Sequence, residues 1–366
     1  MMKSKFIKIE RLLVRSHKTW VEWRGTSGQI YFEHRVSEYQ KMWRSIADDL
    51  GARFSILADN FWELELDGKC IRINNYQLEF DNPVTLSLAG NKPLVHRLLM
   101  EGNIPIPKHI VFRLSELGKA YGFLESNSGY CVIKPADGYG GKGVSTHIKS
   151  TREVDRAAIL ASLYSHNLLM ESQVPGESYR LLVLGGKLVH AVCRQGPRLV
   201  GDGNLTVSEL LERENRRLQN QGKNGFDLDR DCEFTLRYQG LEIDSTPEKG
   251  REIIIKSINE PERNNQEVRT VYNKVVTHLI CERVKEQVEL AAKIVKSDFV
   301  GVDIITVNPQ VPLEDSGGVV NEVNTTPALH HHYDINTEKY PLVAMQAASF
   351  LLDRGLGAEG ERGCSS

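Results

Sequence analysis

The stretch KPADGYGGKGVS, from Lys134 to Ser145, holds four glycines and two lysines between two strand-like segments. Gly138, Gly140 and Gly143 match the pattern GxGxxG, which is weak when it stands alone. A dinucleotide-binding fold needs a helix directly after this loop, but the next residues, GVSTHI, are β-branched and indicate a strand. A P-loop needs Ser or Thr after its lysine, where this chain has Gly143. Both of these folds are therefore excluded.

Two interpretations of the loop remain. It is either a β-hairpin whose glycines let backbone N–H groups approach phosphate oxygens, or a flexible turn with no ligand. Lys134 and Lys142 flank the turn and place positive charge beside it, which favours phosphate. The motifs HRD and DFG, which accompany such a loop in protein kinases, are absent from the sequence, so a kinase is not expected.

A helix is expected upstream of the loop, in NKPLVHRLLMEGNIPIPKHIVF. Asn91 is its predicted N-cap, Pro93 lies in its first turn, and Gly102 ends it. Lys92 then lies at the N-terminus of the helix, where the backbone dipole also favours an anion. Earlier still, residues 1 to 90 combine a helical run closed by Gly51 with the strand-like pieces FSILA and CIRIN.

Downstream of the loop the sequence alternates strands and helices. The run YCVIKP and the run NLLMESQV are expected strands, and capping boxes that begin at Ser150 and Thr206 each open a helix. Gly185 and Gly186, between two apolar runs, mark a β-hairpin. Residues 216 to about 265 are polar and turn-rich with poorly defined elements, and a long amphipathic helix is expected to begin near Thr277.

Two apolar strands near the C-terminus carry isolated polar side chains. Asp303 lies in FVGVDIITV, where an ionised carboxylate is costly unless it has a partner. Glu322 and Asn324 are two residues apart in GVVNEVN, so strand alternation puts both side chains on one face. Three oxygen-bearing side chains on neighbouring strands suit Mg²⁺, and the alternative is a salt-bridged structural pair. The upstream glycine loop and its lysines favour the metal.

The triplet His330, His331 and His332 is poorly placed for a metal cluster. Successive side chains of an extended chain point in opposite directions, so the three imidazoles cannot face one ion. We expect one of them to face a substrate and the other two to face solvent.

Composition limits the class of protein. The 366 residues are enough for a buried core and for two or three domains or subdomains. A net charge of −2 gives no electrostatic case for nucleic acid or an anionic membrane. The first residues form no signal-peptide core, and no stretch approaches membrane-spanning length. The six cysteines have no CxxC spacing, so a zinc module and a disulfide scaffold are disfavoured and a reduced cytoplasmic enzyme is expected.

Five motifs lie in order between about residues 75 and 340, and they read NKPLVHRLLMEGNIPIP, CVIKPADGYGGKGVS, LLMESQVPGESYRLLVLGGKLVHAVCRQGPRLVGDGNLTVSELL, FVGVDIITV and VVNEVNTTPALHHHYDI. Together they resemble the ATP-grasp carboxylate–amine ligases, and within them the ligase domains of cyanophycin synthetase and bifunctional glutathione synthetase. The resemblance implies an α+β ATP-grasp fold, in which two α/β subdomains enclose ATP. The expected domains are an N-terminal α/β region (1–90), a lid subdomain with the glycine hairpin (91–168), a C-terminal subdomain with the Mg²⁺ and substrate site (169–355) and a flexible tail (356–366).

The resemblance also implies roles for individual residues. The expected ATP-binding residues are Lys92, Lys134, Gly138, Gly140, Gly141, Gly143, Glu171, Ser172, Val174 and Glu177. Among these, the lysines contact phosphates, the glycines close over them, the segment 171–174 holds adenine through its backbone, and Glu177 reaches the ribose. The expected Mg²⁺ ligands are Asp303, Glu322 and Asn324, with two ions for which Mn²⁺ can substitute. Arg180 and Arg194 are the expected catalytic residues, facing the transferring phosphate and the acyl intermediate.

The activity implied is ATP-dependent formation of an amide bond between an amino-acid or small-peptide carboxylate and an amine, through an acyl phosphate. Positioning and positive charge supply most of the catalysis in such a reaction, so no dedicated nucleophile is needed. The alternatives are a ligase that modifies a ribosomal precursor peptide and a nucleotide-binding regulatory protein without catalysis. The expected partners are small amino-acid or peptide substrates and a second copy in a homodimer, without nucleic acid or membrane.

The sequence also departs from the family. The relatives carry an Asn-rich, Ser-Thr-Gly-Gly segment near the acceptor substrate, where this chain has KSINEPERNNQEVRTVYNK and only Asn259 can be matched. Pro327 is followed by Ala328 instead of the usual glycine. Residues 1 to 75 resemble no family that we can name. The same substrates therefore cannot be assumed for this chain.

Overall fold

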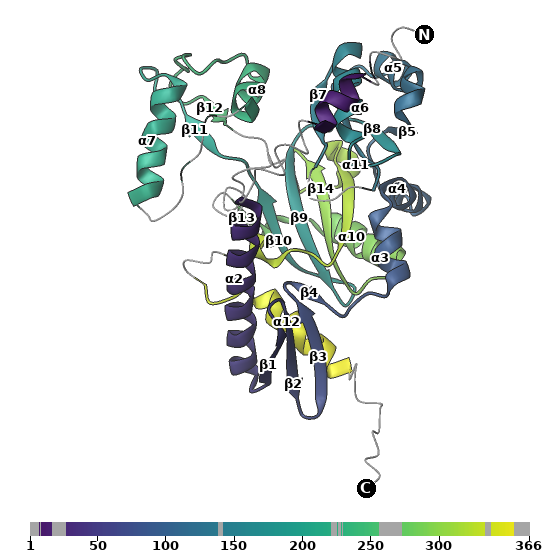
Figure 1. Ribbon diagram of the computed structural model, residues 1–366, viewed down its shortest axis with the longest axis vertical. Coiled ribbons are helices and arrows are strands. Elements are labelled where there is room, and N and C mark those ends of the chain that lie inside the picture. The colour runs from purple at the N-terminus through teal and green to yellow at the C-terminus, as the bar shows by residue number, and fades with distance from the viewer. Residues whose placement is uncertain are drawn as a thin grey trace.

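A computed structural model shows four β-sheets with helices packed on them in the described part of the chain (Figure 1). The structure describes residues 7, 9–16, 27–137, 142–220, 225, 228, 230–255, 273–333 and 338–354. No helix within these ranges is long and apolar enough to cross a membrane. The expected tail, 356–366, and Asn259 lie outside the described residues.

The central sheet is antiparallel and has the strand order β13-β10-β9-β14-β15. Its strands are β9 (Glu177–Leu184), β10 (Lys187–Arg194), β13 (Lys274–Val275), β14 (Phe299–Thr306) and β15 (Val319–Thr325). The hairpin predicted at Gly185 and Gly186 is confirmed, since these residues join β9 to β10. The two apolar strands near the C-terminus are neighbours, as expected.

Helices cover one face of the central sheet (Figure 1). They are α3 (Pro83–Gly90), α4 (Lys92–Glu101) and α10 (Glu282–Val295), and the short helix α11 (Leu313–Ser316) follows β14. Leu181 and Val302, from the middle of the sheet, belong to the buried core that α10 completes with Val288 and Ala291. Burial of these apolar side chains fixes which face of each strand points to the helices.

The start of α10 differs from the expectation. The helix begins at Glu282 with Cys281 as its N-cap, later than the predicted start near Thr277. Residues Thr277–Leu279 form a 3₁₀ turn, and Ile280 after them is extended. The periodic apolar pattern continues through the turn, so the sequence did not reveal this boundary.

The opposite face of the central sheet is divided into two halves. In the apolar half, Leu182, Leu184 and Phe299 pack against an N-terminal layer and the last helix. The elements of that layer are α2 (Ser27–Leu50), β1 (Arg53–Ala58), β2 (Phe61–Leu66), β3 (Lys69–Asn74), β4 (Gln77–Leu78) and α12 (Leu342–Arg354). The other half of this face carries charged residues, so only one half of it is closed by hydrophobic packing.

A second sheet, the lid sheet, has the order β5-β8-β6-β7. Its elements are β5 (His109–Phe112), α5 (Leu117–Ser126), β6 (Cys131–Pro135), β7 (Ser145–Ile148), α6 (Thr151–Ala161) and β8 (Leu168–Ser172). The segment after the glycine loop is the strand β7, which confirms the exclusion of a dinucleotide-binding fold. Gly138, Gly140 and Gly141 lie outside the described residues, whereas Gly143 is described and has a φ of +73°.

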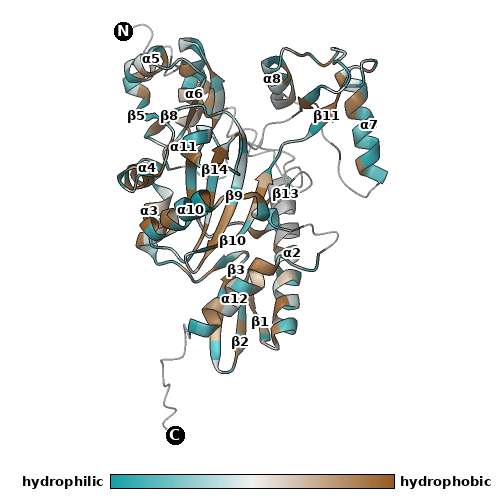
Figure 2. Ribbon diagram, turned by 180° about the vertical axis from the view of Figure 1, so that it is seen from behind, coloured by the Kyte–Doolittle hydropathy of each residue, from teal (hydrophilic) through white to brown (hydrophobic). Residues whose placement is uncertain are grey.

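A small subdomain projects from the central sheet beyond β10 (Figure 1). It consists of β11 (Arg198–Val200), α7 (Val207–Asn220), α8 (Arg230–Tyr238) and β12 (Glu252–Ile254). Its core includes Leu210, Cys232, Leu236 and Ile253, while α7 is mostly hydrophilic along its length (Figure 2). The expectation that residues 216 to 265 have poorly defined elements is therefore wrong for α8 and β12. These elements are short, and their apolar residues become a core only when the two segments meet.

Gly176 lies in the connection from β8 to β9 and packs against the end of β14, and a substitution there can test this contact. Its φ is +118°, and a Cβ atom there would collide with the backbone of Thr306 and Val307. We expect Gly176→Ala to lower the free energy of unfolding by about 2–3 kcal/mol in urea denaturation. Gly186→Ala is the control, because its φ of +77° is similar but nothing lies within 4 Å, and about 1 kcal/mol is expected. Equal losses in the two variants would contradict the predicted collision.

Candidate functional site

Charged residues lie in a row across three strands on the polar half of the central sheet. Arg180 in β9 is paired directly with Asp303 in β14, which is paired directly with Glu322 in β15. Because directly opposite residues of antiparallel strands have side chains on the same face, the three side chains gather there. Asn324 lies two residues beyond Glu322 in β15, and Arg194 lies in β10 two residues beyond Val192, which is the residue opposite Arg180.

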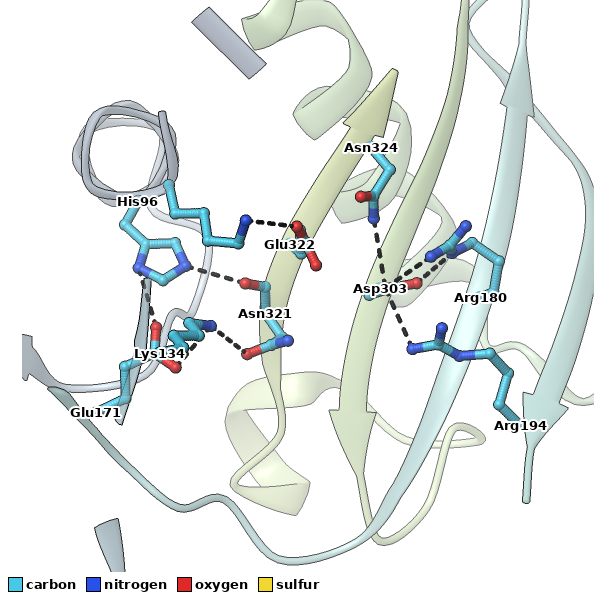
Figure 3. A network of polar contacts seen from close by, with 10 residues as sticks. His96, Lys134, Glu171, Arg180, Arg194, Asp303, Asn321, Glu322 and Asn324 are labelled. Carbon is cyan, nitrogen blue, oxygen red and sulfur yellow. Dashed lines mark hydrogen bonds and ion pairs between the residues drawn. The ribbon is translucent and has the colours of Figure 1, made fainter. Parts of the chain in front are cut away.

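Asp303 is the centre of this row (Figure 3). Two nitrogens of Arg180 donate to its carboxylate, with a distance of 2.9 Å between Nη2 and Oδ2. Nη2 of Arg194 and Nδ2 of Asn324 donate to the same oxygen at 3.2 and 3.3 Å. Burial lowers the pKa of Arg180, but the charge and hydrogen bonds of Asp303 outweigh it and leave that pKa raised. The partner expected for the buried carboxylate is thus a pair of arginines.

A second cluster joins the lid sheet to the edge strand β15. Nζ of Lys134 in β6 lies 2.7 Å from Oε2 of Glu171 in β8 and 3.4 Å from Oδ1 of Asn321 in β15. At the start of α4, Nζ of Lys92 lies 3.0 Å from Oε1 of Glu322. The predicted cap of this helix is confirmed, since Oδ1 of Asn91 accepts from the backbone N–H of Leu94 at 3.1 Å. Two lysines therefore converge on the strand that carries the expected metal ligands.

His96 belongs to this second cluster, and the sequence interpretation missed it. It lies one turn after Lys92 in α4, and its Nε2 is 3.0 Å from the carbonyl oxygen of Asn321. Its Nδ1 lies 3.7 Å from Oε1 of Glu171. Burial is the main reason that the pKa of His96 is lowered. The only signal in the sequence was the four-residue spacing from Lys92, which places both side chains on one face of a helix.

The two clusters together have an excess of positive charge. Lys92, Lys134, Arg180 and Arg194 supply four cations, whereas Glu171, Asp303 and Glu322 supply three carboxylates. Because the arginines and Asp303 are largely withdrawn from water, their electrostatic interactions are stronger than at the surface. Such a set of side chains suits a ligand that carries several negative charges.

The remaining expected ATP-binding residues lie around the connection from the lid sheet to the central sheet. Oγ of Ser172 donates to Oδ1 of Asn127 at 2.8 Å, and Val174 is half-buried after β8. Glu177 begins β9 and forms an ion pair with Arg198. The roles assigned to these residues from the resemblance stay predictions.

The expectation that two histidines of the triplet face solvent is wrong. His331 and His332 are 6% and 3% exposed, and His330 is half-buried. The prediction assumed an extended chain, but Leu329–His331 form a 3₁₀ turn. Nδ1 of His330 lies 3.0 Å from the hydroxyl of Tyr39 in α2, so this segment packs under the N-terminal layer.

Comparison with known proteins shows which family this chain is similar to. No protein-family model matches the chain. It is 31% identical over 259 residues to cyanophycin synthetase of Nostoc sp., and the match covers 68% of this chain and 27% of that protein. It is 28% identical to the bifunctional glutathione biosynthesis protein of Clostridium perfringens, covering 69% of this chain and 32% of that protein. The chain belongs to the ATP-grasp ligases.

The crystal structure of a bifunctional glutathione synthetase from Pasteurella multocida supports the fold. It matches with a TM-score of 0.55 and 21% identity, over 83% of this chain and 42% of that chain. The α+β ATP-grasp fold class predicted from the sequence is thereby confirmed. This ATP-grasp chain spans about a quarter to a third of the length of the curated relatives it matches.

Proposed function

We propose that this chain is an ATP-dependent ligase that forms an amide bond between the carboxylate of an amino acid or small peptide and an amine. In this reaction the carboxylate becomes an acyl phosphate, and ADP and phosphate are released. The observation that carries the proposal is the contact of Lys92 with Glu322 at 3.0 Å. It brings a lysine expected at the phosphates to a carboxylate expected at the metal, although the two belong to distant parts of the chain.

The residues of the site have distinct proposed roles. Lys92 and Lys134 bind the phosphates of ATP. The excess positive charge around Asp303 also attracts these phosphates. Arg180 and Arg194 stabilise the negative charge that develops on the acyl phosphate and on the tetrahedral intermediate. A carboxylate and an amine held together beside these cations would react faster because their orientation is fixed in advance.

The oxygen donors of the site fit Mg²⁺. Asp303 and Glu322 offer carboxylates and Asn324 offers an amide oxygen on one face of two paired strands, which are the hard ligands that Mg²⁺ prefers. These three residues would hold it, with two ions proposed from the resemblance. When bound, Mg²⁺ supplies charge neutralisation for the phosphates of ATP.

The small subdomain supports a peptide acceptor as a second candidate. The ring of Tyr238, in α8, lies 3.6 Å from the ring of His147 in β7, centroid to centroid. The subdomain therefore contacts the lid sheet and extends the surface around the site. A ligase that modifies a ribosomal precursor peptide would need such an additional surface.

The test is direct. Purified protein is incubated with Mg-ATP and pools of amino acids, dipeptides or precursor-like peptides, and ADP, phosphate and product mass are measured. ADP release together with a product of the mass expected for an amide supports the proposal, and the productive pool identifies the substrate class. Tight ATP binding without turnover in any pool would contradict it and favour a nucleotide-binding regulatory protein.

A further inference from the structure

Two histidines lie beside the arginines of the site. Nδ1 of His190, in β10, is 2.9 Å from Nδ1 of His332. His332 is 3% exposed, and its Nε2 has no hydrogen-bond partner within the described ranges. His190 precedes Arg194 by four residues on the same strand, which places both side chains on one face together with Arg180.

The contact between the two imidazoles restricts their protonation. A contact between two Nδ1 atoms needs one hydrogen, so one ring donates and the other accepts. Burial lowers the pKa of His190. Burial, and then the neighbouring His190, Arg180, His330 and Arg194, hold the pKa of His332 well below its ordinary value. Both rings are therefore neutral at neutral pH, and Nε2 of His332 is a buried polar atom available to a ligand.

We propose that His332 accepts the proton that the amine substrate loses during amide formation, and that His190 holds its ring in the required tautomer. In that tautomer, Nδ1–H of His332 donates to Nδ1 of His190, and Nε2 of His332 keeps its lone pair. This inference rests on the proposed function, because it assigns the amine to the side of the arginine cluster where His332 lies.

The step balances with the substrates already named. The amine enters as its ammonium ion and gives one proton to Nε2 of His332, and the freed lone pair forms a C–N bond at the acyl carbon. The C–O bond to phosphate breaks, and phosphate leaves with its electron pair and takes up the second N–H proton. The bound acyl phosphate also brings negative charge to Arg180 and Arg194, which offsets their effect and raises the pKa of His332 toward the working pH.

Hydroxylamine distinguishes the role of His332 as proton acceptor from a role in acyl phosphate formation or in folding. It is unprotonated at neutral pH and attacks acyl phosphates without a base. The experiment compares the rates of amide and hydroxamate formation by wild type, His332→Gln and the control His166→Gln, whose histidine is exposed on the lid. We expect His332→Gln to lose about 100-fold or more in amide formation and to keep its hydroxamate rate. The amide rate should partly recover as the pH rises and more of the amine is unprotonated.

The other outcomes are equally informative. Equal loss of both products in His332→Gln would overturn the inference, since it would indicate a role in acyl phosphate formation or in folding. An unchanged amide rate would overturn it too. If His332→Gln does not fold, His190→Asn decides, with a smaller loss confined to the amide expected. Wild type that forms neither product would instead refute the proposed function itself.

Discussion

Asp303→Asn is expected to lower the free energy of unfolding by about 3–5 kcal/mol, which is the usual cost of removing one partner from a buried ion pair. The asparagine keeps the size of the side chain but removes the charge that Arg180 and Arg194 share. Both arginine side chains are at least 90% withdrawn from solvent, so water cannot replace the carboxylate. Turnover in the proposed ligase should be lost as well, since the arginines would no longer be held in place.

The measurement is urea denaturation of the variant beside a matched control, Asp298→Asn. Asp298 forms an ion pair with Arg354 in which both side chains are more than 40% exposed. Exposed pairs contribute little, so less than about 1 kcal/mol should be lost in the control. A similar small loss in both variants would show that the buried ion pairs of Asp303 do not stabilise the folded protein as expected.

Glu322→Ala is expected to lower turnover by about 1,000-fold or more, because it removes a carboxylate proposed to hold Mg²⁺. The Glu322 side chain is 26% exposed, whereas that of its partner Lys92 is 11% exposed, so a loss of stability of about 1–2 kcal/mol is expected, between the values for exposed and buried pairs. A large loss of activity with a smaller loss of stability would distinguish this variant from Asp303→Asn.

The turnover of Glu322→Ala is followed over a range of Mg²⁺ concentrations, with Glu286→Ala as the control. Glu286 is an exposed residue of α10 that pairs with Arg283 and lies on the helix-covered side of the sheet, so wild-type turnover is expected. Unchanged turnover in Glu322→Ala would show that the assignment of the metal ligands is wrong.

Local patterns in the sequence predicted most of the elements that build the site. The N-cap at Asn91 places Lys92 at the start of a helix, the Gly185 and Gly186 pair makes a hairpin, and alternation puts Glu322 and Asn324 on one face. These signals act over a few residues, through hydrogen bonds and backbone conformations that the nearest neighbours fix. They can therefore be read without knowledge of the rest of the chain.

Contacts between distant segments could not be read in this way. His96 was missed because only the docking of α4 on β15 shows that it contacts Asn321. The histidine triplet was misjudged because its 3₁₀ turn is packed under α2. The ion pairs of Asp303 depend on the order β10-β9-β14, which strand alternation alone does not determine.

The sequence by itself thus determined the fold class, the exclusion of dinucleotide and P-loop folds, and the residue types available for chemistry, since all of these follow from short-range patterns and from five motifs in order. Only the tertiary structure decided that both arginines converge on Asp303, that Lys92 reaches Glu322, and that His332 lies buried beside them. The physical reason is that hydrophobic packing of the sheets and helices, which involves the whole chain, brings these distant side chains together.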